Sequence, residues 1–389
     1  MRNVIIILLF ISAISCRNEN REQRNLDSRI SAEYLETITV NVDDFDFDQL
    51  GNWLKADKYV KLAPTPLLSV IKDIQIREGK IFIHDAFARI VCYDMQGKLL
   101  WLIDAEGVGP GEYTSIHELV INTETSEVVI YDNPALSLLF YDMKTGRYLR
   151  TEKLFKPNPT DIAFADGLYF YDSQYHNNYP NDTMLHYSLL TSRDGINIEQ
   201  RFFKHDDSEA EYMFSDSPKN FYYSDSLLLY CKNFDNIIYQ IGANRINARY
   251  QINLPDPLPC SFIEDKINPI EMLKSSYSSG ITNVYECGSL LYFCYTKGDA
   301  YMMSLYDRDN QEMIYSGRRM FGGNNPNLPL LRLMDGVYKG QFFSVLTPEY
   351  LGDSTICSQP AYPDVLRDYN SDDDNPVIAF YDVIRSQSK

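Results

Sequence analysis

The stretch VIKDIQIREGKIFIHDAFARIVCYDMQGKLLWLI, residues 70–103, contains the clearest fold signal in the chain. Apolar and β-branched residues recur in four short runs. Two of the breaks between runs are turn signals, Glu78-Gly79-Lys80 and Met95-Gln96-Gly97-Lys98, and the third is a short loop after His84-Asp85. Four strands joined by tight turns in about 45 residues are typical of one blade of a β-propeller.

The same order of strands and turns returns in residues 116–146, where a Gly turn at 143–146 again follows three apolar runs. Two markers give the period. The Tyr-Asp-Met triplets at 93–95 and 141–143 lie 48 residues apart, and the strand-ending Asp85 and Asp132 lie 47 residues apart. Two markers that agree on one period indicate a structural repeat.

Later units keep this rhythm with weaker similarity, at residues 161–203, 221–254, 281–320 and 330–382. In the last unit we expect strands at 330–334, 341–346 and 376–382, with no fourth strand after them. Residues 59–62 form a strand-like run without a partner, and pairing the two ends would remove both exposed sheet edges. The sequence therefore predicts an all-β, six-bladed propeller over residues 59–384, with four-stranded antiparallel blades and a ring closed by the N-terminal strand.

The N-terminus predicts export. Arg2 precedes an apolar run over residues 4–14, which is shorter than the roughly 20 residues that span a bilayer. The run ends in Ala13-Ile14-Ser15-Cys16, which resembles a bacterial lipobox, with Ala13 in place of the usual larger aliphatic residue. Residues 1–16 are thus read as a lipoprotein-type signal with Cys16 as the lipidation site. The alternative is an ordinary cleaved signal with an incidental cysteine.

Both readings place the mature chain outside the cytoplasm. The lipoprotein reading puts it in the periplasm or at the outer membrane, with the lipid anchor as its only membrane attachment. Residues 17–58 are polar and acidic, and we expect a tether and a loosely attached lead-in. The composition argues against nucleic acid as a partner, because 36 Lys and Arg against 54 Asp and Glu give a net charge of −18. The sequence contains no CxxC, GxSxG or HExxH motif.

The loop Gly107-Val108-Gly109-Pro110-Gly111-Glu112-Tyr113 adds a more specific signal. With the repeats and the signal ending in Cys16, it resembles the exported six-bladed β-propeller lipoproteins of Bacteroides-type bacteria, relatives of the NHL-repeat propellers. The resemblance covers residues 59–384, and it implies a fold and an envelope location without a particular activity. The glycines also suggest a phosphate-binding loop, but the Lys-Ser/Thr pair is missing, so we expect a tight connection between blades.

Propeller connectivity assigns each loop to one of two faces. Loops between second and third strands, and between blades, share the face that also carries the long segments 173–183, 204–218, 255–280, 317–328 and 347–375. We call this the long-loop face, and we expect function there and at the mouth of the central channel. The candidate ligand-binding residues on it are His84, Asp85, Arg89, Glu112, Tyr113, Asp132, Asn133, Tyr171, Tyr175, His176, Lys297, Arg318 and Arg319.

Aromatic rings beside acid, amide and guanidinium groups can stack on sugars or peptide side chains and bond to their polar edges. The sequence thus favours a non-catalytic binding module for a glycan, a peptide or an envelope protein. A second reading is a hydrolase or lyase that uses a divalent metal in the channel, held by His84 and His117 with Asp85 or Glu112. A third is a structural docking platform. Asp85 and Asp132 also suit a plain role as turn residues.

Overall fold

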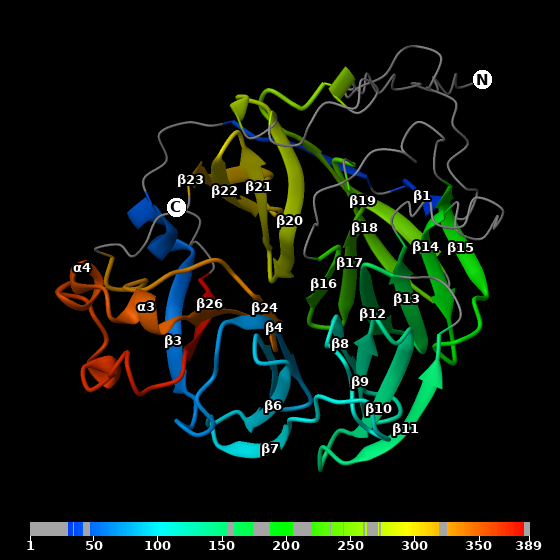
Figure 1. Cartoon of the computed structure of the whole chain (residues 1–389). Helices are drawn as coiled ribbons and strands as arrows, with labels where there is room; N and C mark the ends of the chain where they lie inside the picture. Colours follow the sequence, from blue (N-terminus) through cyan, green and yellow to red (C-terminus); the bar gives the residue numbers. More distant parts are fainter. Residues whose placement is uncertain are drawn as a thin grey trace, which may run out of the picture.

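Strands account for most of the chain in the computed structural model, which describes residues 30–33, 35–41, 47–154, 159–173, 187–204, 219–233, 235–243, 245–259, 261–262, 271, 274–318 and 325–384. Within these residues, four separate four-stranded antiparallel sheets and one ten-stranded sheet stand in a propeller arrangement (Figure 1). The all-β propeller class expected from the sequence is therefore confirmed.

Each of the four separate sheets is built from strands that follow one another in the chain. The first two sheets contain β4 (Ile71–Arg77), β5 (Lys80–Asp85), β6 (Arg89–Asp94) and β7 (Leu99–Ile103), then β8 (Glu118–Asn122), β9 (Glu127–Asp132), β10 (Ser137–Asp142) and β11 (Tyr148–Lys153). The other two contain β12 (Asp161–Ala165), β13 (Leu168–Asp172), β14 (Tyr187–Ser192) and β15 (Gln200–Lys204), then β20 (Ser278–Cys287), β21 (Leu290–Lys297), β22 (Ala300–Asp307) and β23 (Glu312–Arg318).

The ten-stranded sheet consists of two antiparallel groups joined by a single parallel pair, Ser224 with Val337. One group is β16 (Phe221–Ser224), β17 (Leu227–Cys231), β18 (Ile237–Gly242) and β19 (Arg245–Asn253), to which β1 (Ile30–Ser31) and β2 (Glu36–Thr39) add in parallel. The other is β24 (Gly336–Tyr338), β25 (Gln341–Leu346), β26 (Val377–Val383) and β3 (Leu54–Lys61), in which the N-terminal strand pairs antiparallel with the last one.

The turns and the burial pattern follow from local sequence. Glu78 and Gly79 both have positive φ, 46° and 73°, and they close the tight hairpin between β4 and β5. The three residues Ile81–Ile83 of β5 are fully buried, because neighbouring sheets cover both of its faces. The side chains between adjacent sheets, such as Tyr113 between the first two, form the core.

The first strands of successive groups contact one another in a closed series: β4 with β8, β8 with β12, β12 with β16, β16 with β20, β20 with β24, and β24 with β4. Figure 1 shows these strands arranged around a common axis. We call the space that they enclose the channel.

The N-terminal boundary differs from the expectation. We expected a strand at residues 59–62, whereas β3 begins at Leu54. The segment before it was expected to be loosely attached, but β2 pairs with β19, and the 3-10 helix η2 (Phe47–Asn52) buries Phe47 and Leu50. These apolar side chains are too widely spaced to show a period, yet each packs into the core.

The last unit also needs a correction. Residues 330–334 were expected to form a strand, whereas the strand β24 begins only at Gly336, and the turn into β25 falls at Lys339-Gly340, both with positive φ. Leu330, Leu331 and Met334 are buried outside any strand, since they fill the core as an irregular segment. A run of apolar residues indicates that the segment is buried, but a buried segment need not form a strand.

Residues 347–376, which we call the insert, separate β25 from β26 and contain α3 (Pro348–Leu351), α4 (Ser354–Cys357) and the 3-10 helix η4 (Asp364–Leu366). In the part of the chain that the structure describes, no helix has the length and apolarity needed to cross a membrane. Four cysteines, Cys92, Cys231, Cys287 and Cys294, are buried, and Cys357 is exposed.

Candidate functional site

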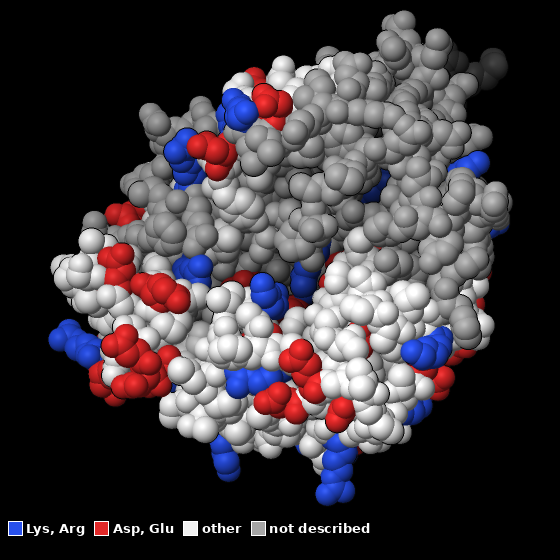
Figure 2. Space-filling model, viewed as in Figure 1, with Lys and Arg blue, Asp and Glu red and all other residues white. Residues whose placement is uncertain are grey.

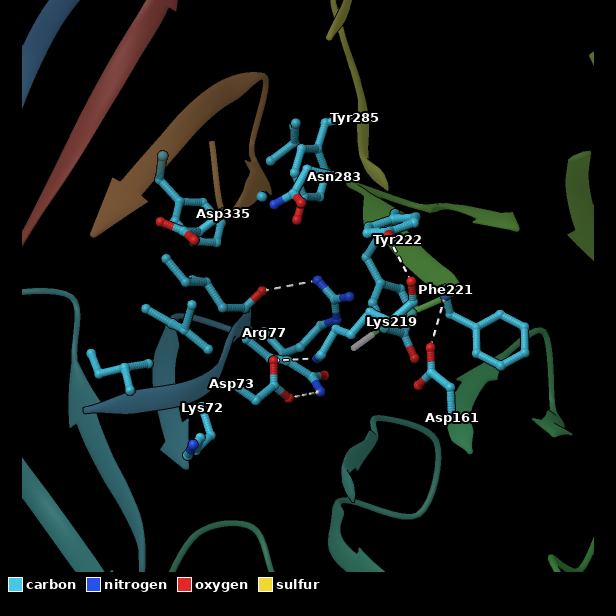
Figure 3. A pocket seen from close by; sticks show the side chains of 18 of the residues that line it. Lys72, Asp73, Arg77, Asp161, Lys219, Phe221, Tyr222, Asn283, Tyr285 and Asp335 are labelled. Atoms are coloured by element: carbon cyan, nitrogen blue, oxygen red, sulfur yellow. Dashed lines mark hydrogen bonds and ion pairs between the residues drawn. The ribbon is translucent and has the colours of Figure 1, made fainter. Parts of the chain in front are cut away.

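The channel contains a cavity of about 230 Å³ at the ends of the first strands. Figure 3 shows side chains from β4, β16 and β20 converging on it. Its polar and aromatic lining includes Lys72, Asp73, Gln75, Arg77, Asp161, Lys219, Tyr223, Asn283, Tyr285 and Asp335. We treat this cavity as the candidate site, because concave surfaces with a few convergent polar groups are where proteins bind small molecules.

Strand β4 supplies three polar residues in alternating positions. Asp73, Gln75 and Arg77 share one face of the strand, since side chains alternate between faces. The Gln75 amide nitrogen donates to Asp73 Oδ2 at 3.0 Å and to the Leu119 carbonyl at 2.7 Å, which fixes the orientation of the amide. Its Oε1 atom is buried and has no hydrogen-bond partner among the described residues.

Arg77 is the second group with spare hydrogen-bonding capacity. Its guanidinium lies over the ring of Tyr223, 3.9 Å from the centroid, and Nη1 donates to the Ile76 carbonyl at 3.1 Å. The Nη2 atom is buried and lacks a hydrogen-bond partner within the described ranges. Two residues of the cavity lining therefore each carry a buried polar atom without a described partner, an acceptor on Gln75 and a donor on Arg77.

Lys219 interacts with several of the charged groups at the site. It forms an ion pair with Asp73 (Figure 3), and the charges of Glu118 and Asp161 also act on it. Burial disfavours the charged ammonium, but the three carboxyl groups outweigh burial and raise the pKa of Lys219. Burial would likewise raise the pKa of Asp73, but the charge of Lys219 and hydrogen bonds from Lys219 and Gln75 lower it.

The other two acids are pushed toward protonation. Burial raises the pKa of Asp161 to about 7, although Lys219 and the amides of Asn220 and Phe221, at 2.6 and 2.9 Å, favour the carboxylate. Burial, with a contribution from Asp161, raises the pKa of Glu118 well above its usual range. Burial thus favours the protonated forms of Asp161 and Glu118, whereas Lys219 favours the ionised form of Asp73.

His84 is the sequence-predicted residue that comes nearest to this site. It lies on β5 directly opposite Asp73 in register and is buried. Burial lowers the pKa of His84, and the nearby carboxylates Asp73 and Asp85 only partly oppose that effect. The imidazole is therefore neutral at physiological pH.

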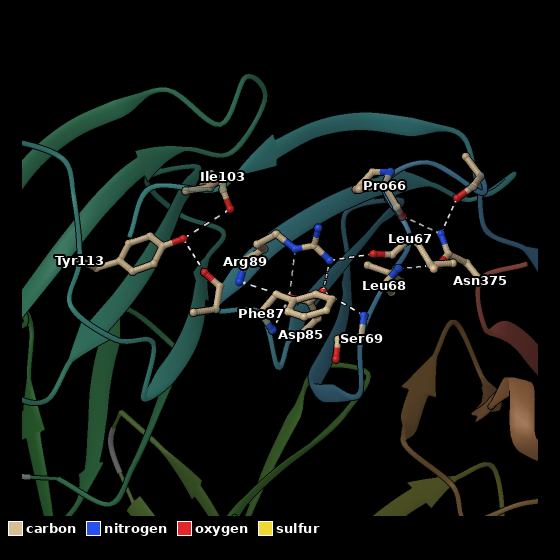
Figure 4. Close-up of polar contacts among 12 residues, drawn as sticks. Pro66, Leu67, Leu68, Ser69, Asp85, Phe87, Arg89, Ile103, Tyr113 and Asn375 are labelled. Atoms are coloured by element: carbon tan, nitrogen blue, oxygen red, sulfur yellow. Dashed lines mark hydrogen bonds and ion pairs between the residues drawn. The ribbon is translucent and has the colours of Figure 1, made fainter. Parts of the chain in front are cut away.

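Asp85 and Arg89 are brought together, but in a turn beside the channel (Figure 4). The fully buried Asp85 carboxylate accepts from the amides of Ser69, Phe87 and Arg89 at 3.1–3.3 Å and forms an ion pair with the Arg89 guanidinium. Arg89 also donates to the Leu67 carbonyl at 2.8 Å. Both side chains hold two loops together. For Asp85 this agrees with the alternative stated above, in which it serves only as a turn residue.

Four more of the predicted residues bond within their own surroundings. Tyr113 is fully buried and donates to the Ala88 carbonyl at 2.7 Å, while Glu112 accepts from the Gly109 amide at 2.8 Å inside the Gly-rich loop that connects β7 to β8. Asp132 accepts from the Thr114 amide and hydroxyl, each at 2.7 Å. Asn133 accepts from the Tyr131 hydroxyl at 3.1 Å.

The remaining predicted residues are scattered. Tyr171 is buried and donates to the Gly195 carbonyl at 2.5 Å, Lys297 pairs with Asp256 at 2.7 Å, and Arg318 is the exposed last residue of β23. Tyr175, His176, Arg319 and Cys16 lie outside the described residues. The predicted residues whose positions are described do not form one cluster.

The metal-dependent reading required His84, His117, Asp85 and Glu112 to meet. His117 packs edge-on against Tyr131, with ring centroids 5.7 Å apart, and the two acids bind elsewhere. Among the residues with described positions, no group of three or more His, Cys, Asp or Glu side chains could hold a metal ion.

Sequence reasoning missed Asp73, Glu118 and Asp161, although a signal was present. Each is an acid near the start of the first strand of a unit, and they follow one another at spacings of 45 and 43 residues, close to the repeat period. An acid in an apolar strand at the repeat spacing indicates a shared position in the ring. No comparable sequence signal indicates Lys219, because it follows a long charged segment and not an apolar strand.

Comparison with known proteins agrees with this architecture. Residues 40–382 match the model of a family described as a domain of unknown function, DUF4934. A Bacteroides fragilis protein, whose name marks it as expected to be exported, has a similar structure with a TM-score of 0.73 at 16% identity, covering 90% of this chain and all of that one. A member of the DUF4221 family from Bacteroides vulgatus matches with a TM-score of 0.50 at 12% identity, over 86% of this chain and all of the other. No curated protein matches the sequence.

Proposed function

The chain belongs to the DUF4934 family, and from its propeller arrangement and channel cavity we propose that it is a non-catalytic binding module of the cell envelope. We propose export through residues 1–16 with a lipid anchor at Cys16, in the periplasm or at the outer membrane. The ligand that we propose for the channel cavity is a small, neutral molecule rich in hydroxyl groups, such as the sugar unit of a glycan. The likeness to a Bacteroides protein expected to be exported supports the envelope location.

We infer that the ten-stranded sheet represents two blades linked by one bridging pair, which makes six blades in all. Two observations support this inference. The first strands β4, β8, β12, β16, β20 and β24 contact one another in a closed series. The antiparallel pairing of β26 with β3 gives the last blade its fourth strand and supports a ring closed from the N-terminal side.

The observation that carries the ligand proposal is that two side chains of the cavity lining each hold a buried polar atom without a described partner, an acceptor on Gln75 and a donor on Arg77. A hydroxyl group both donates and accepts, so a polyhydroxylated ligand can satisfy both atoms. Buried polar atoms without partners are costly, and filling them would make binding favourable.

Charge and size point to the same ligand class. Lys72, Arg77 and Lys219 face Asp73, Asp161 and Asp335 in the lining, so the cavity does not select strongly for an ion of either sign. The rings of Tyr223 and Tyr285 offer apolar surface of the kind on which sugar rings pack. A volume of about 230 Å³ is smaller than the roughly 300 Å³ at which drug-sized pockets begin.

The test is thermal unfolding and calorimetric titration of the full chain with a panel of neutral monosaccharides and oligosaccharides, with matched acidic and cationic sugars, and with EDTA. A ligand at 100 times its dissociation constant stabilises the folded state by about 2.7 kcal/mol. Arg77→Met should weaken sugar binding by about ten- to a hundredfold, the equivalent of one buried hydrogen bond to a charged group.

Arg193→Met is the matched control, because Arg193 is 71% exposed, pairs with Glu199 and does not line the cavity. We expect it to bind sugars like the wild type. No stabilisation by any neutral sugar, or equal binding by wild type and Arg77→Met, would contradict the proposal. Loss of stability in EDTA that one metal restores would replace it with the metal-dependent reading.

A further inference from the structure

A second surface, on two loops beside the channel, exposes apolar side chains. Leu67, Val70 and Phe87 are 52%, 67% and 61% exposed, and they are among nine large apolar residues with high exposure in the described chain. They come from the segment between β3 and β4 and from the turn between β5 and β6. Clustered exposed apolar residues mark interaction sites more often than single ones do. We call Leu67, Val70 and Phe87 the apolar patch.

The two loops are held rigidly (Figure 4). Asp85 accepts from the amides of Ser69 and Phe87, and the Ala86 amide donates to the Val70 carbonyl at 2.8 Å. Arg89 joins the loops through the Leu67 carbonyl, and its guanidinium stacks on the ring of Phe87, 4.8 Å from the centroid. A surface already fixed in position loses little freedom when a partner binds.

The insert lies directly beside the apolar patch. Asn375 accepts from the Leu68 amide at 2.7 Å and donates to the carbonyls of Ala63 and Pro66 at 2.6 and 2.9 Å. On the same side, Lys61 pairs with Asp368 at 2.5 Å. These contacts fix the insert against the loop that carries Leu67 and Val70.

The insert is strongly acidic. Residues 347–376 contain seven acids, Glu349, Asp353, Asp364, Asp368, Asp372, Asp373 and Asp374, and one base, Arg367. Asp364 and Asp368 have side chains that are 88% and 81% exposed. Figure 2 shows Asp and Glu side chains gathered over the part of the molecule where Figure 1 draws α3 and α4. An apolar patch thus borders a surface of net charge −6.

We propose that the apolar patch and the insert together form a docking surface for a cationic, amphipathic segment of another envelope protein. Its apolar side chains would pack on Leu67, Val70 and Phe87, and its Lys and Arg residues would face the acids of the insert. This surface is separate from the channel cavity, so the proposal stands independently of the sugar ligand.

Charge complementarity selects this occupant over two others. A two-fold contact with a second copy of the chain would bring the same surface patches together and oppose the two acidic inserts. Bilayer surfaces that carry anionic lipids would be repelled by the same acids. A basic segment gains electrostatic attraction and apolar burial at once, which also speeds association.

The experiment is selection of random peptides displayed on phage against the full chain, with counter-selection on the double variant Leu67→Ser, Phe87→Ser. Leu100→Ser is the matched control, since Leu100 is an exposed apolar residue, 43% accessible, on the outer strand β7. The enriched peptides should combine apolar residues with an excess of Lys and Arg. The best peptide should bind the double variant about tenfold or more weakly and the control like wild type.

A second variant, Asp372→Asn with Asp373→Asn, tests the charge separately, and we expect several-fold weaker binding that converges with wild type as salt is raised. All substituted side chains are exposed, so the thermal midpoint should not move. Enrichment of neutral or acidic peptides, equal binding to the double Ser variant, or no enrichment would overturn the proposal. Self-association of the chain that the double Ser variant abolishes would assign the surface to a second copy of the chain and overturn the proposal. Binding to anionic vesicles would assign the surface to a membrane and overturn the proposal as well.

Discussion

Lys219→Met tests the electrostatics of the channel directly. The ammonium forms an ion pair with Asp73, which is only 9% exposed, and its charge also favours ionisation of Glu118 and Asp161. Breaking a buried pair by removing one partner costs about 3–5 kcal/mol. The Lys219 side chain is 29% exposed, so we expect the lower end of that range, about 3 kcal/mol, at pH 8.

The loss should shrink to about 1 kcal/mol at pH 5, because a buried acid without its partner neutralises by taking up a proton. In the wild type the pKa of Asp73 is lowered, so its carboxylate adds stability that is present above the unfolded pKa of about 4 and is lost as pH falls through the folded value. In the variant, burial alone acts on Asp73 and raises that pKa instead. Lys219 itself stays charged throughout this pH range, since its pKa is raised.

Urea unfolding at pH 5 and pH 8 measures both values. Lys144→Met is the control, because Lys144 is exposed on the turn after β10, and it should change the free energy of unfolding by no more than about 0.5 kcal/mol. A loss in Lys219→Met that is equal at both pH values, or smaller than that of the control, would refute the reasoning that this ammonium stabilises buried carboxylates.

Three further predictions concern single positions. Burial raises the pKa of Asp161 to about 7. The folded state therefore holds a proton that the unfolded chain releases above about pH 4. The free energy of unfolding of the wild type should fall as pH rises from about 4 to 7. Asp161→Asn should make that slope shallower by at most about 1.4 kcal/mol per pH unit, and an unchanged slope in urea unfolding would contradict this. Tyr113→Phe removes a hydroxyl that donates to the Ala88 carbonyl and accepts from the Ala105 amide, and it should cost about 1–3 kcal/mol in thermal unfolding. Gly97 has φ +80°, and a Cβ there would lie 2.0 Å from the Lys61 carbonyl oxygen, whereas Gly280 has φ +70° with nothing within 4 Å. Gly97→Ala should therefore destabilise by more than about 1 kcal/mol and by more than Gly280→Ala, and equal losses would show that the close approach to Lys61 does not matter.

The candidate site shows where sequence reasoning stopped. Asp85 and Asp132 stand at strand ends one repeat apart, a pattern equally typical of ligand-binding acids and of turn acids. The structure places both carboxylates on backbone amides of neighbouring loops. Asp73 lies within the apolar strand β4, and Asp161 begins the apolar strand β12. An acid in either position is easily taken for a solvent-facing residue. Only the closed series of first strands turns these positions toward one channel.

The sequence by itself determined most of the strands and turns and their period. Hairpins such as the one at Glu78-Gly79 depend on a few adjacent residues, because the left-handed backbone and the alternation of apolar side chains are local properties. Only the tertiary structure decided that Lys219 meets Asp73, 146 residues away in the chain, and that Asn375 holds the loop at Leu68. Such contacts depend on how the sheets are placed around the axis. Pairing of charges and the cost of burying them arise from distances and surroundings that no short stretch of sequence encodes.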